Sequence, residues 1–396
     1  MRKARERLKS GDFIFLILVL GLVIFGIIMV FSASYYSSIN ATGSPYGYLI
    51  RELIFAVTGT ALMIGAALLD YRVWGKWAPA LLVISLLLLV AVLSPLGTEV
   101  NGAKRWLGAG VLTIMPGEVA KLCVIFFVAR YFSDKPNRIT SFSKGILPMF
   151  GLCIVMGVLV LLQPNMSTAI TIIGIIILMM FIAGMRYRYL IGLIIAGVAG
   201  GAALIFSAPY RMKRLTSFQD PFKDASGDGY QVVQSLLALG SGGIFGLGLG
   251  KSVQKTLYLP EPQNDFILAI IGEELGYVGI VILLIVYMLL IWRGIKIAME
   301  APDRLSMLLA SGITIMIGLQ VILNVAVVTS SMPPTGVILP FVSYGGNALW
   351  LFMIAAGIML NISRHGKKRK EESENESNHD RRRHRRSHLS GNRYSR

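Results

Sequence analysis

Long runs of apolar residues, separated by short polar segments, make up most of the chain from residue 13 onward. Many of these runs come close to the roughly 20 apolar residues that a helix needs to cross a bilayer. Together with the flanking charges, they predict ten membrane-spanning helices. These cover residues 13–31, 53–69, 77–96, 116–132, 146–163, 167–184, 190–207, 266–292, 305–327 and 344–362. The predicted fold class is therefore all-α, a polytopic membrane protein.

The polar segments divide the chain into three predicted parts. Residues 1–12 form a basic N-terminus, 13–363 form the ten-helix membrane domain, and 364–396 form a charged tail. The tail lacks apolar periodicity, which predicts disorder. Within the membrane domain, one large outer loop of about residues 208–265 separates the seventh and eighth helices, and its apolar piece Val232 to Leu239 predicts a helix at the membrane surface.

The composition and the placement of charge exclude several classes of protein. Of the 396 residues, 55% are hydrophobic and 15% are charged, which excludes an ordinary soluble domain. The net charge is +17, and +11 of it lies in residues 2–9 and 364–396. Basic segments beside apolar spans orient membrane proteins and bind anionic lipid, so the charge predicts cytoplasmic termini without nucleic acid. Anionic lipid is favoured over a protein as the tail's partner.

The histidine and cysteine residues limit the chemistry. All four histidines lie at or beyond His365, in the tail, and the only cysteines, Cys123 and Cys153, lie in apolar runs. Zinc sites, disulfide scaffolds and Cys or His triads are therefore not expected. An acid or base catalyst in this chain must be a carboxylate, a lysine or a tyrosine.

Asp265 stands directly before the eighth apolar run, at the predicted outer interface. From its position alone, the favoured interpretation is a helix cap that accepts backbone N–H bonds. The alternative is a partly desolvated base that faces a lipid head group. Burial would raise the pKa of its carboxyl group and the helix N-terminus would lower that pKa.

Several ionisable side chains lie within the apolar runs, where charge is costly. Glu118 and Lys121 are three residues apart on one helical face, so they form either a structural ion pair or part of a site. Glu273 and Glu274 are expected to be functional or tightly paired. Gln320 and Asn324 are expected to form hydrogen bonds between helices. They also lie deeper in the membrane, where a transporter would need polar groups.

A second set of candidates is basic. Lys104, Arg105, Arg211, Lys213 and Arg214 fall in two loops on the predicted outer face. Solvated surface charge is the usual explanation for such residues. Positive charge on the outer face nevertheless runs against the positive-inside rule, and it suits an anionic group such as a pyrophosphate.

Seven motifs between residues 102 and 346 resemble the FtsW, RodA and SpoVE proteins, the SEDS family, and the resemblance runs from about residue 12 to residue 363. The motifs are Gly102-Ala103-Lys104-Arg105-Trp106-Leu107, Pro116-Gly117-Glu118 through Lys121, Gln163-Pro164-Asn165, Ala208-Pro209-Tyr210-Arg211, Gly227-Asp228-Gly229-Tyr230-Gln231 with Gln234-Ser235, Leu259 to Gly276, and Pro334-Thr335-Gly336 through Ser343-Tyr344-Gly345-Gly346. The Pro260 to Gln263 form resembles the division and sporulation branch more than the elongation branch.

The resemblance implies a ten-helix enzyme of the bacterial plasma membrane. Such an enzyme polymerises lipid II into peptidoglycan glycan strands on the outer face, together with a class B penicillin-binding protein and other divisome membrane proteins. The resemblance makes Asp265 the essential residue and associates Glu118, Lys121 and Arg105 with activity. Gln231 and Ser343 lie in its motifs as supporting candidates. A divalent cation, Mg or Mn, is left open as a cofactor.

These expectations combine into one mechanism. Asp265 is the general base that deprotonates the 4-hydroxyl of an acceptor sugar, and undecaprenyl pyrophosphate is the leaving group. Basic side chains can neutralise that leaving group, which suits a site without histidine. Two other functions remain open, namely a lipid II flippase and a non-catalytic divisome scaffold.

Overall fold

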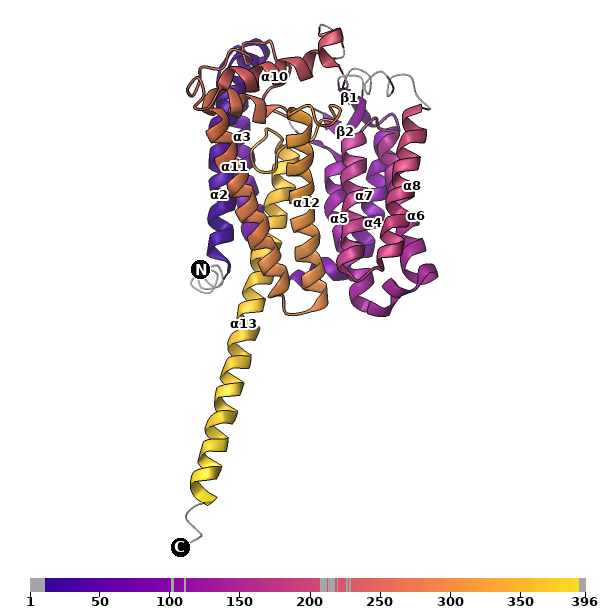
Figure 1. Cartoon of the computed structure of the whole chain (residues 1–396), viewed down its shortest axis with the longest axis vertical. Helices are drawn as coiled ribbons and strands as arrows, with labels where there is room; N and C mark the ends of the chain where they lie inside the picture. The colour runs from indigo at the N-terminus through magenta and orange to yellow at the C-terminus, as the bar shows by residue number, and fades with distance from the viewer. Residues whose placement is uncertain are drawn as a thin grey trace.

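The computed structural model of the chain describes residues 11–100, 103–109, 112–206, 212, 218, 220–225, 227 and 229–391. Long helices run side by side in one bundle (Figure 1). They are α2 (Phe13–Thr42), α3 (Gly47–Leu68), α4 (Tyr71–Leu93), α5 (Pro116–Asp134), α6 (Leu147–Leu161), α7 (Met166–Ile182), α8 (Tyr187–Phe206), α11 (Ile267–Met299), α12 (Arg304–Val328) and α13 (Gly346–Gly391). Each of the ten predicted ranges falls on one of these helices.

Seven helical segments in the described part of the chain are long and apolar enough to cross a membrane. They are α2, α3, α4, Phe142–Leu161, α11, α12 and Gly346–Lys367. Helices α7 and α8 supply shorter apolar stretches. The polytopic helical fold is confirmed, while a count of ten crossings stays a prediction.

The helices extend beyond the predicted apolar runs because polar residues continue them outside the apolar span. Helix α2 begins after Asp12, whose side chain accepts a bond from the amide of Phe15 at 3.0 Å. It continues through polar residues to Thr42 and ends at Gly43, whose φ of 72° is the left-handed conformation of a helix C-terminus. Hydropathy therefore located this helix but not its C-terminal end.

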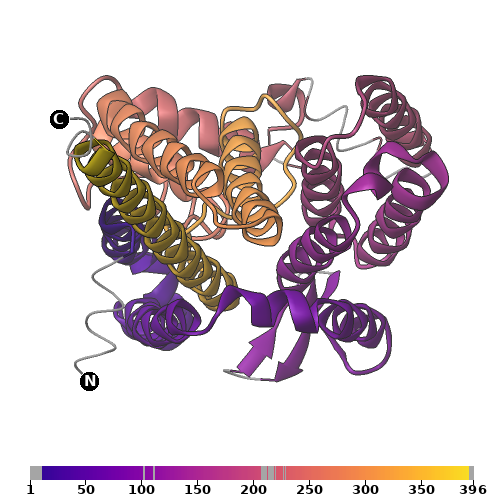
Figure 2. The ribbon, with the colours of Figure 1, turned by 90° about the horizontal axis from the view of Figure 1, so that it is seen from below.

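Helix α13 lies at the centre of one half of the bundle. Seen from below, α13 runs between the pair α2 and α3 on one side and α11 and α12 on the other (Figure 2). Helices α4 to α8 form the other half. Helix α13 therefore joins α2 and α3, from the start of the chain, to α11 and α12.

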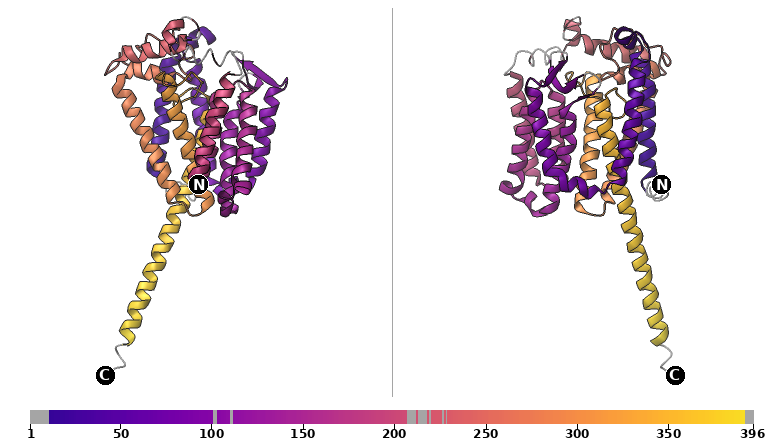
Figure 3. Two further views of the ribbon diagram at one scale, coloured as in Figure 1. Left: turned by 45° about the vertical axis from the view of Figure 1, so that its right-hand side comes forward. Right: turned by 180° about the vertical axis from the view of Figure 1, so that it is seen from behind.

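A small sheet was not predicted. Strands β1 (Gly97–Val100), β2 (Ala103–Ala109) and β3 (Leu112–Ile114) form an antiparallel sheet in the order β1-β2-β3. The sheet lies at the same end of the bundle as α10 (Tyr230–Gly242), and we call this the sheet end (Figure 3). Side chains alternate across a strand, so three short strands are compatible with a segment that hydropathy marks only as a loop.

Helix α10 confirms that Val232 to Leu239 is helical. It lies across the sheet end of the bundle and packs against α11 and α12 (Figure 1). Its Ser235 hydroxyl donates to the carbonyl of Val328 at 2.9 Å, which fixes α10 to the end of α12. A short 3₁₀ helix, Pro221–Asp224, precedes it.

Helix α11 contains a sharp kink at Gly276, where φ is 70° and ψ is −171°. A Cβ at this position would come within 2.3 Å of the Gly246 amide nitrogen and 2.4 Å of the Ile244 carbonyl oxygen. Only glycine allows this backbone conformation and this close approach. The kink therefore separates a buried first segment, which follows Asp265, from the apolar span that begins at Tyr277.

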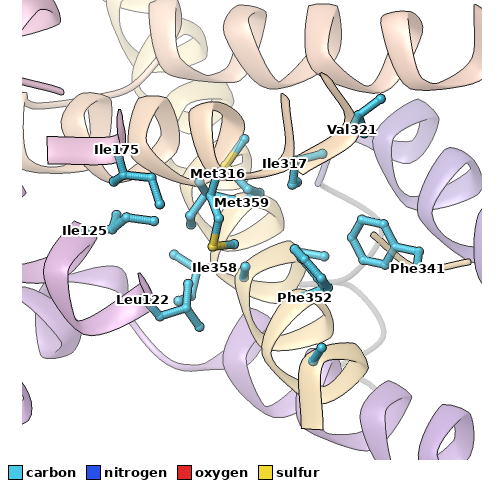
Figure 4. Packing of buried hydrophobic residues seen from close by; sticks show 14 of the residues in the cluster. Leu122, Ile125, Ile175, Met316, Ile317, Val321, Phe341, Phe352, Ile358 and Met359 are labelled. Atoms are coloured by element: carbon cyan, nitrogen blue, oxygen red, sulfur yellow. The ribbon is translucent and has the colours of Figure 1, made fainter. Parts of the chain in front are cut away.

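Aliphatic and methionine side chains fill the interior between α5, α7, α12 and α13 (Figure 4). Ile125, Ile175, Met316 and Met359 are each at most 2% exposed. Deleting such a side chain from a packed interior typically costs about 2–5 kcal/mol. These contacts hold the four helices together, and all four contribute to the wall of the cavity described below.

At the opposite end of the bundle, the first and last residues of the membrane domain contact each other. Asp12, at the start of α2, pairs with Arg293 of α11, and its amide donates to the Ser363 hydroxyl of α13 at 2.9 Å. The Lys367 ammonium donates to the carbonyl of Gly11 at 2.9 Å. The start of α2 and the exit of α13 thus lie at one end, which we call the tail end.

The tail differs from its prediction. Helix α13 continues as one helix of 46 residues to Gly391 and projects far beyond the other helices (Figures 1 and 3). Residues 364–391 were predicted to be disordered. Lysine, arginine and glutamate lose little side-chain freedom in a helix, and a helix that extends an existing one has no nucleation cost.

Candidate functional site

A cavity of about 950 Å³ opens among the helices at the sheet end. Its walls come from α3, α5, α7, α10, α12, the start of α13, β2, β3 and two loops around residues 260–265 and 334–345. Five of the predicted site residues line it, namely Asp265, Glu118, Lys121, Arg105 and Gln231. The motifs are far apart in the sequence, and the fold brings their polar side chains to one place.

Asp265 is held through its backbone carbonyl, and its carboxylate lines the cavity. The side-chain amide of Asn324 on α12 donates to the Asp265 carbonyl at 2.8 Å and to the Val337 carbonyl at 2.6 Å. The predicted role of Asn324 in joining helices is therefore visible, although its partners are loop carbonyls. A Cβ placed on Gly336 would lie 3.7 Å from Asp265 Oδ2, so the carboxylate faces this glycine.

The interpretation of Asp265 as a helix cap is wrong. Helix α11 begins at Ile267, its N-cap is Phe266, and no side-chain bond caps it. Burial instead raises the pKa of the Asp265 carboxyl group to about 6. Its own backbone amide and the Arg105 guanidinium lower this pKa, and Glu261 raises it. A carboxyl group near this pKa is suited to general-base work near neutral pH.

Glu118 and Lys121 form the predicted ion pair. The distance from Lys121 Nζ to Glu118 Oε1 is 2.7 Å, and the side chains are 2% and 10% exposed respectively. Helix α5 begins with Pro116, whose missing N–H costs nothing in a first turn. Glu118 lies in the first turn of the helix and Lys121 in the next, on the face that lines the cavity.

The basic residues of β2 point in different directions. Arg105 lines the cavity, where its guanidinium donates to the carbonyl of Gln163 at 3.4 Å and also to the carbonyl of Pro164. Lys104, the preceding residue, is exposed and pairs in register with Glu99 of β1. Period-two alternation thus separates two residues that the sequence placed together.

Three further basic candidates, Arg211, Lys213 and Arg214, lie outside the described residues. Of the supporting candidates, Gln231 lines the cavity from the first turn of α10. Ser343 does not line it, because its buried hydroxyl accepts the Leu339 amide at 2.8 Å and stabilises the turn before α13.

Sequence reasoning missed several cavity residues. Arg51 lines the wall from α3, but the predicted span began at residue 53 and left it in a loop. Its charge beside an apolar run was a usable signal. Thr335 and Tyr344 also line the wall. Both lie in the last of the motifs that carry the family resemblance, but they are uncharged, so neither was singled out as a site residue.

Glu273 and Glu274 belong to a separate buried network. The Glu274 carboxylate contacts the Lys255 ammonium at 2.8 Å and accepts the Ser32 hydroxyl of α2 at 2.7 Å. Glu273 accepts the Val253 amide at 2.9 Å. Both glutamates are fully buried, and Lys255 is 3% exposed. Of the two predicted alternatives, the geometry matches tight pairing, which fixes the segment before Asp265 against α11 and α2.

The described residues do not form a metal site by themselves. Nowhere in that part of the chain do three or more His, Cys, Asp or Glu side chains come together. Asp265, Glu118 and Glu261 line the same cavity without forming such a group. We therefore assign no step of the reaction to a divalent cation.

The fold and the cavity define a class, a polytopic helical membrane protein with a polar, carboxylate-bearing cavity at one end of its bundle. The chain belongs to the FtsW, RodA and SpoVE family, described as cell cycle proteins, whose family model matches residues 12–368. The predicted family membership is thereby confirmed.

Two curated relatives cover nearly all of the membrane domain. Stage V sporulation protein E of Bacillus subtilis is 43% identical over 359 residues, which is 90% of this chain and 98% of that protein. The probable peptidoglycan glycosyltransferase FtsW of Trichlorobacter lovleyi is 39% identical over 358 residues, 90% of this chain and 94% of that protein. The second name agrees with the predicted enzyme class.

Solved structures share the fold. A chain from a peptidoglycan synthase complex that coordinates polymerization and crosslinking superposes with a TM-score of 0.75 at 26% identity, covering 90% of this chain and 98% of that one. The rod shape determining protein RodA of Thermus thermophilus gives 0.67 at 28% identity, covering 89% and 97%. The predicted fold class is confirmed at the level of the whole membrane domain.

Proposed function

We propose that this protein is a peptidoglycan glycosyltransferase that polymerises lipid II during cell division or sporulation. The names of its relatives support the reaction class. The observation that carries the proposal is the position of Asp265, whose carboxylate lines the same cavity as Lys121 and Arg105. Burial raises the pKa of this carboxyl group to about 6. A base and cations around one space are what a glycosyl transfer to an alcohol needs.

In the proposed reaction, Asp265 accepts the proton from the 4-hydroxyl of the acceptor sugar. The hydroxyl oxygen forms a bond to the anomeric carbon of the donor sugar, and the bond from that carbon to the pyrophosphate oxygen breaks. The electron pair leaves with undecaprenyl pyrophosphate. The proton on Asp265 is afterwards released to water, which returns the base to its ionised form.

Positive charge replaces the general acid in this mechanism. Pyrophosphate leaves as a stable anion, so it needs neutralisation more than protonation. Lys121 lines the cavity at 2% exposure, and Arg105 lines it from β2. Two backbone carbonyls hold the Arg105 guanidinium in the wall. A guanidinium has five N–H donors, so it can also bind the leaving group.

The orientation is also a proposal. We propose that the tail end and both termini lie in the cytoplasm, and the positive charge near the tail end supports this orientation. The sheet end and its cavity then lie on the outer face of the plasma membrane. A class B penicillin-binding protein and other divisome proteins are the expected partners, supported by the synthase complex that shares the fold.

The pH dependence of kcat/KM should report the base. Asp265 acts only when ionised, so activity should fall as the pH drops through its pKa of about 6. We expect kcat/KM to be half-maximal near that pH and to fall about tenfold per unit below about pH 5. Initial rates with fluorescent lipid II in mixed buffers measure this. A flat profile from pH 5 to 7 would contradict the assignment.

Purified protein in liposomes, with and without its partner synthase, separates the proposed enzyme from the alternatives. We expect glycan strands from lipid II, measured by gel electrophoresis of the labelled product. A flippase would move labelled lipid II across the bilayer without forming strands, and a scaffold would form strands only when a different, catalytically active polymerase is added. Either result would overturn the proposal.

A further inference from the structure

Three neutral polar side chains in the cavity wall have a buried acceptor atom without a partner among the described residues; one is Asn264, next to Asp265, and the other two are Gln320 and Thr335. Within the part of the chain that the structure describes, Gln320 Oε1 and Thr335 Oγ1 are buried and make no hydrogen bond. The residues are 2% and 7% exposed, and both line the cavity. An unpaired buried polar atom is costly, and such atoms in a native structure call for an explanation.

These two side chains lie beside the proposed base. Asn324, one turn along α12 from Gln320, binds the carbonyls of both Asp265 and Val337. That face of α12 is therefore turned toward both loops. Thr335 directly precedes Gly336, the residue that the Asp265 carboxylate faces. A ligand group held by Gln320 and Thr335 would lie within the reach of Asp265.

The chemistry of the unpaired atoms selects the ligand. The amide oxygen of Gln320 can only accept a hydrogen bond, so its partner must be a donor. An ionised pyrophosphate has no proton to donate and would be repelled by this oxygen. A sugar offers hydroxyl groups, and an acetamido sugar also offers an amide N–H. The uncharged amide of Gln320 and hydroxyl of Thr335 can bind such a sugar through hydrogen bonds alone.

We propose that Gln320 and Thr335 bind the acetamido sugar that presents its hydroxyl to Asp265, with Gln320 Oε1 accepting the acetamido N–H. This inference rests on the proposed function and assigns the acceptor side of the same cavity. It divides the cavity into a cationic part around Lys121 and Arg105 for the leaving group and a neutral part for the acceptor. Gln320 and Thr335 are specificity-determining residues, and neither exchanges a proton in the reaction.

The test compares two substrates in two variants, Gln320→Met and Thr335→Val, which keep side-chain size. The probe is lipid II in which an ester oxygen replaces the N–H of the acceptor's acetamido group. We expect the unchanged protein to lose about 3- to 10-fold in kcat/KM on the probe. Gln320→Met should show that loss already with natural lipid II and no further loss on the probe. The pKa near 6 in its pH profile should remain.

Thr335→Val gives an independent measurement if Gln320→Met does not fold. We expect a rise in KM of about 3- to 10-fold with kcat changed less. The matched control is Thr314→Val, because Thr314 lies on α12, donates to the Ala310 carbonyl at 2.8 Å and does not line the cavity. It should leave KM unchanged.

Two outcomes are decisive and distinct. If Gln320→Met discriminates against the probe as strongly as the unchanged protein, and Thr335→Val leaves KM unchanged, the acceptor assignment is overturned. That result leaves the proposed function intact as long as Asp265→Asn remains inactive. If Asp265→Asn polymerises normally, the proposed function itself fails.

Discussion

Asp265→Asn is expected to lower the rate of glycan polymerisation by about 10²- to 10⁴-fold, the usual contribution of a general base. Asparagine has the shape of aspartate but cannot accept the proton. The backbone contact from Asn324 to residue 265 does not involve the side chain, so the loop should keep its position. The measurement is initial-rate polymerisation of fluorescent lipid II by purified protein with its partner.

The same variant should be more stable than the unchanged protein. The folded-state pKa of Asp265, about 6, lies above the ordinary value of 3.8, so the folded state holds the carboxyl proton more tightly. Stability is then lost as the pH rises from about 4 through about 6, by on the order of 1 to 3 kcal/mol. Asparagine removes this loss. Thermal unfolding should show a higher Tm for the variant above pH 6 and no difference below pH 4.

Asp220→Asn is the matched control, because Asp220 is exposed before α10 and does not line the cavity. It should change neither the rate nor the Tm. Polymerisation by Asp265→Asn at the normal rate would remove Asp265 from the role of base. A lower Tm for Asp265→Asn above pH 6 would show that its carboxylate is stabilising, contrary to the effect of burial.

Breaking the Glu118 and Lys121 ion pair should have the second large effect. Glu118→Gln or Lys121→Met alone leaves one buried charge without its partner, which typically costs about 3–5 kcal/mol. The double variant removes both charges and should recover most of this loss. It should nevertheless stay inactive, because the leaving group then lacks the Lys121 ammonium. Thermal unfolding and the polymerisation assay on all four proteins measure the two effects separately.

Helix α5 offers a matched control in the exposed pair of Arg130 and Asp134, which are 2.8 Å apart with side chains 44% and 42% exposed. Exposed pairs contribute about 0–1 kcal/mol, so Arg130→Met should change Tm and activity little. If the double variant of Glu118 and Lys121 regains full activity, the pair is structural only. If both single variants are silent, the pair contributes neither stability nor activity.

The sequence predicted the helices well because ten apolar runs are long signals that neighbouring structure rarely overrides. It also selected Asp265, Glu118 and Lys121, because an ionisable residue in or beside an apolar run is expensive wherever it lies. In the structure, these three residues line the same cavity. Their catalytic roles remain proposals.

Other features depend on tertiary contacts that a linear pattern does not carry. Lys104 and Arg105 differ in direction because a short strand forms there. Ser343 shares a motif with cavity residues but closes a turn instead. From the sequence, Gln320 was expected to form a hydrogen bond between helices. In the fold it lines the cavity, and its amide oxygen has no partner among the described residues.

The long C-terminal helix sets how far its charges reach. From Lys367, where the apolar span ends, to Arg381, where the run of arginines begins, an α-helix rises by about 21 Å. Electrostatic attraction is screened over about 8 Å at physiological salt. A helix that leaves the bilayer as α13 leaves the bundle would hold these arginines beyond the range at which anionic head groups attract them, so this part of the tail would reach away from the membrane and would not anchor to it.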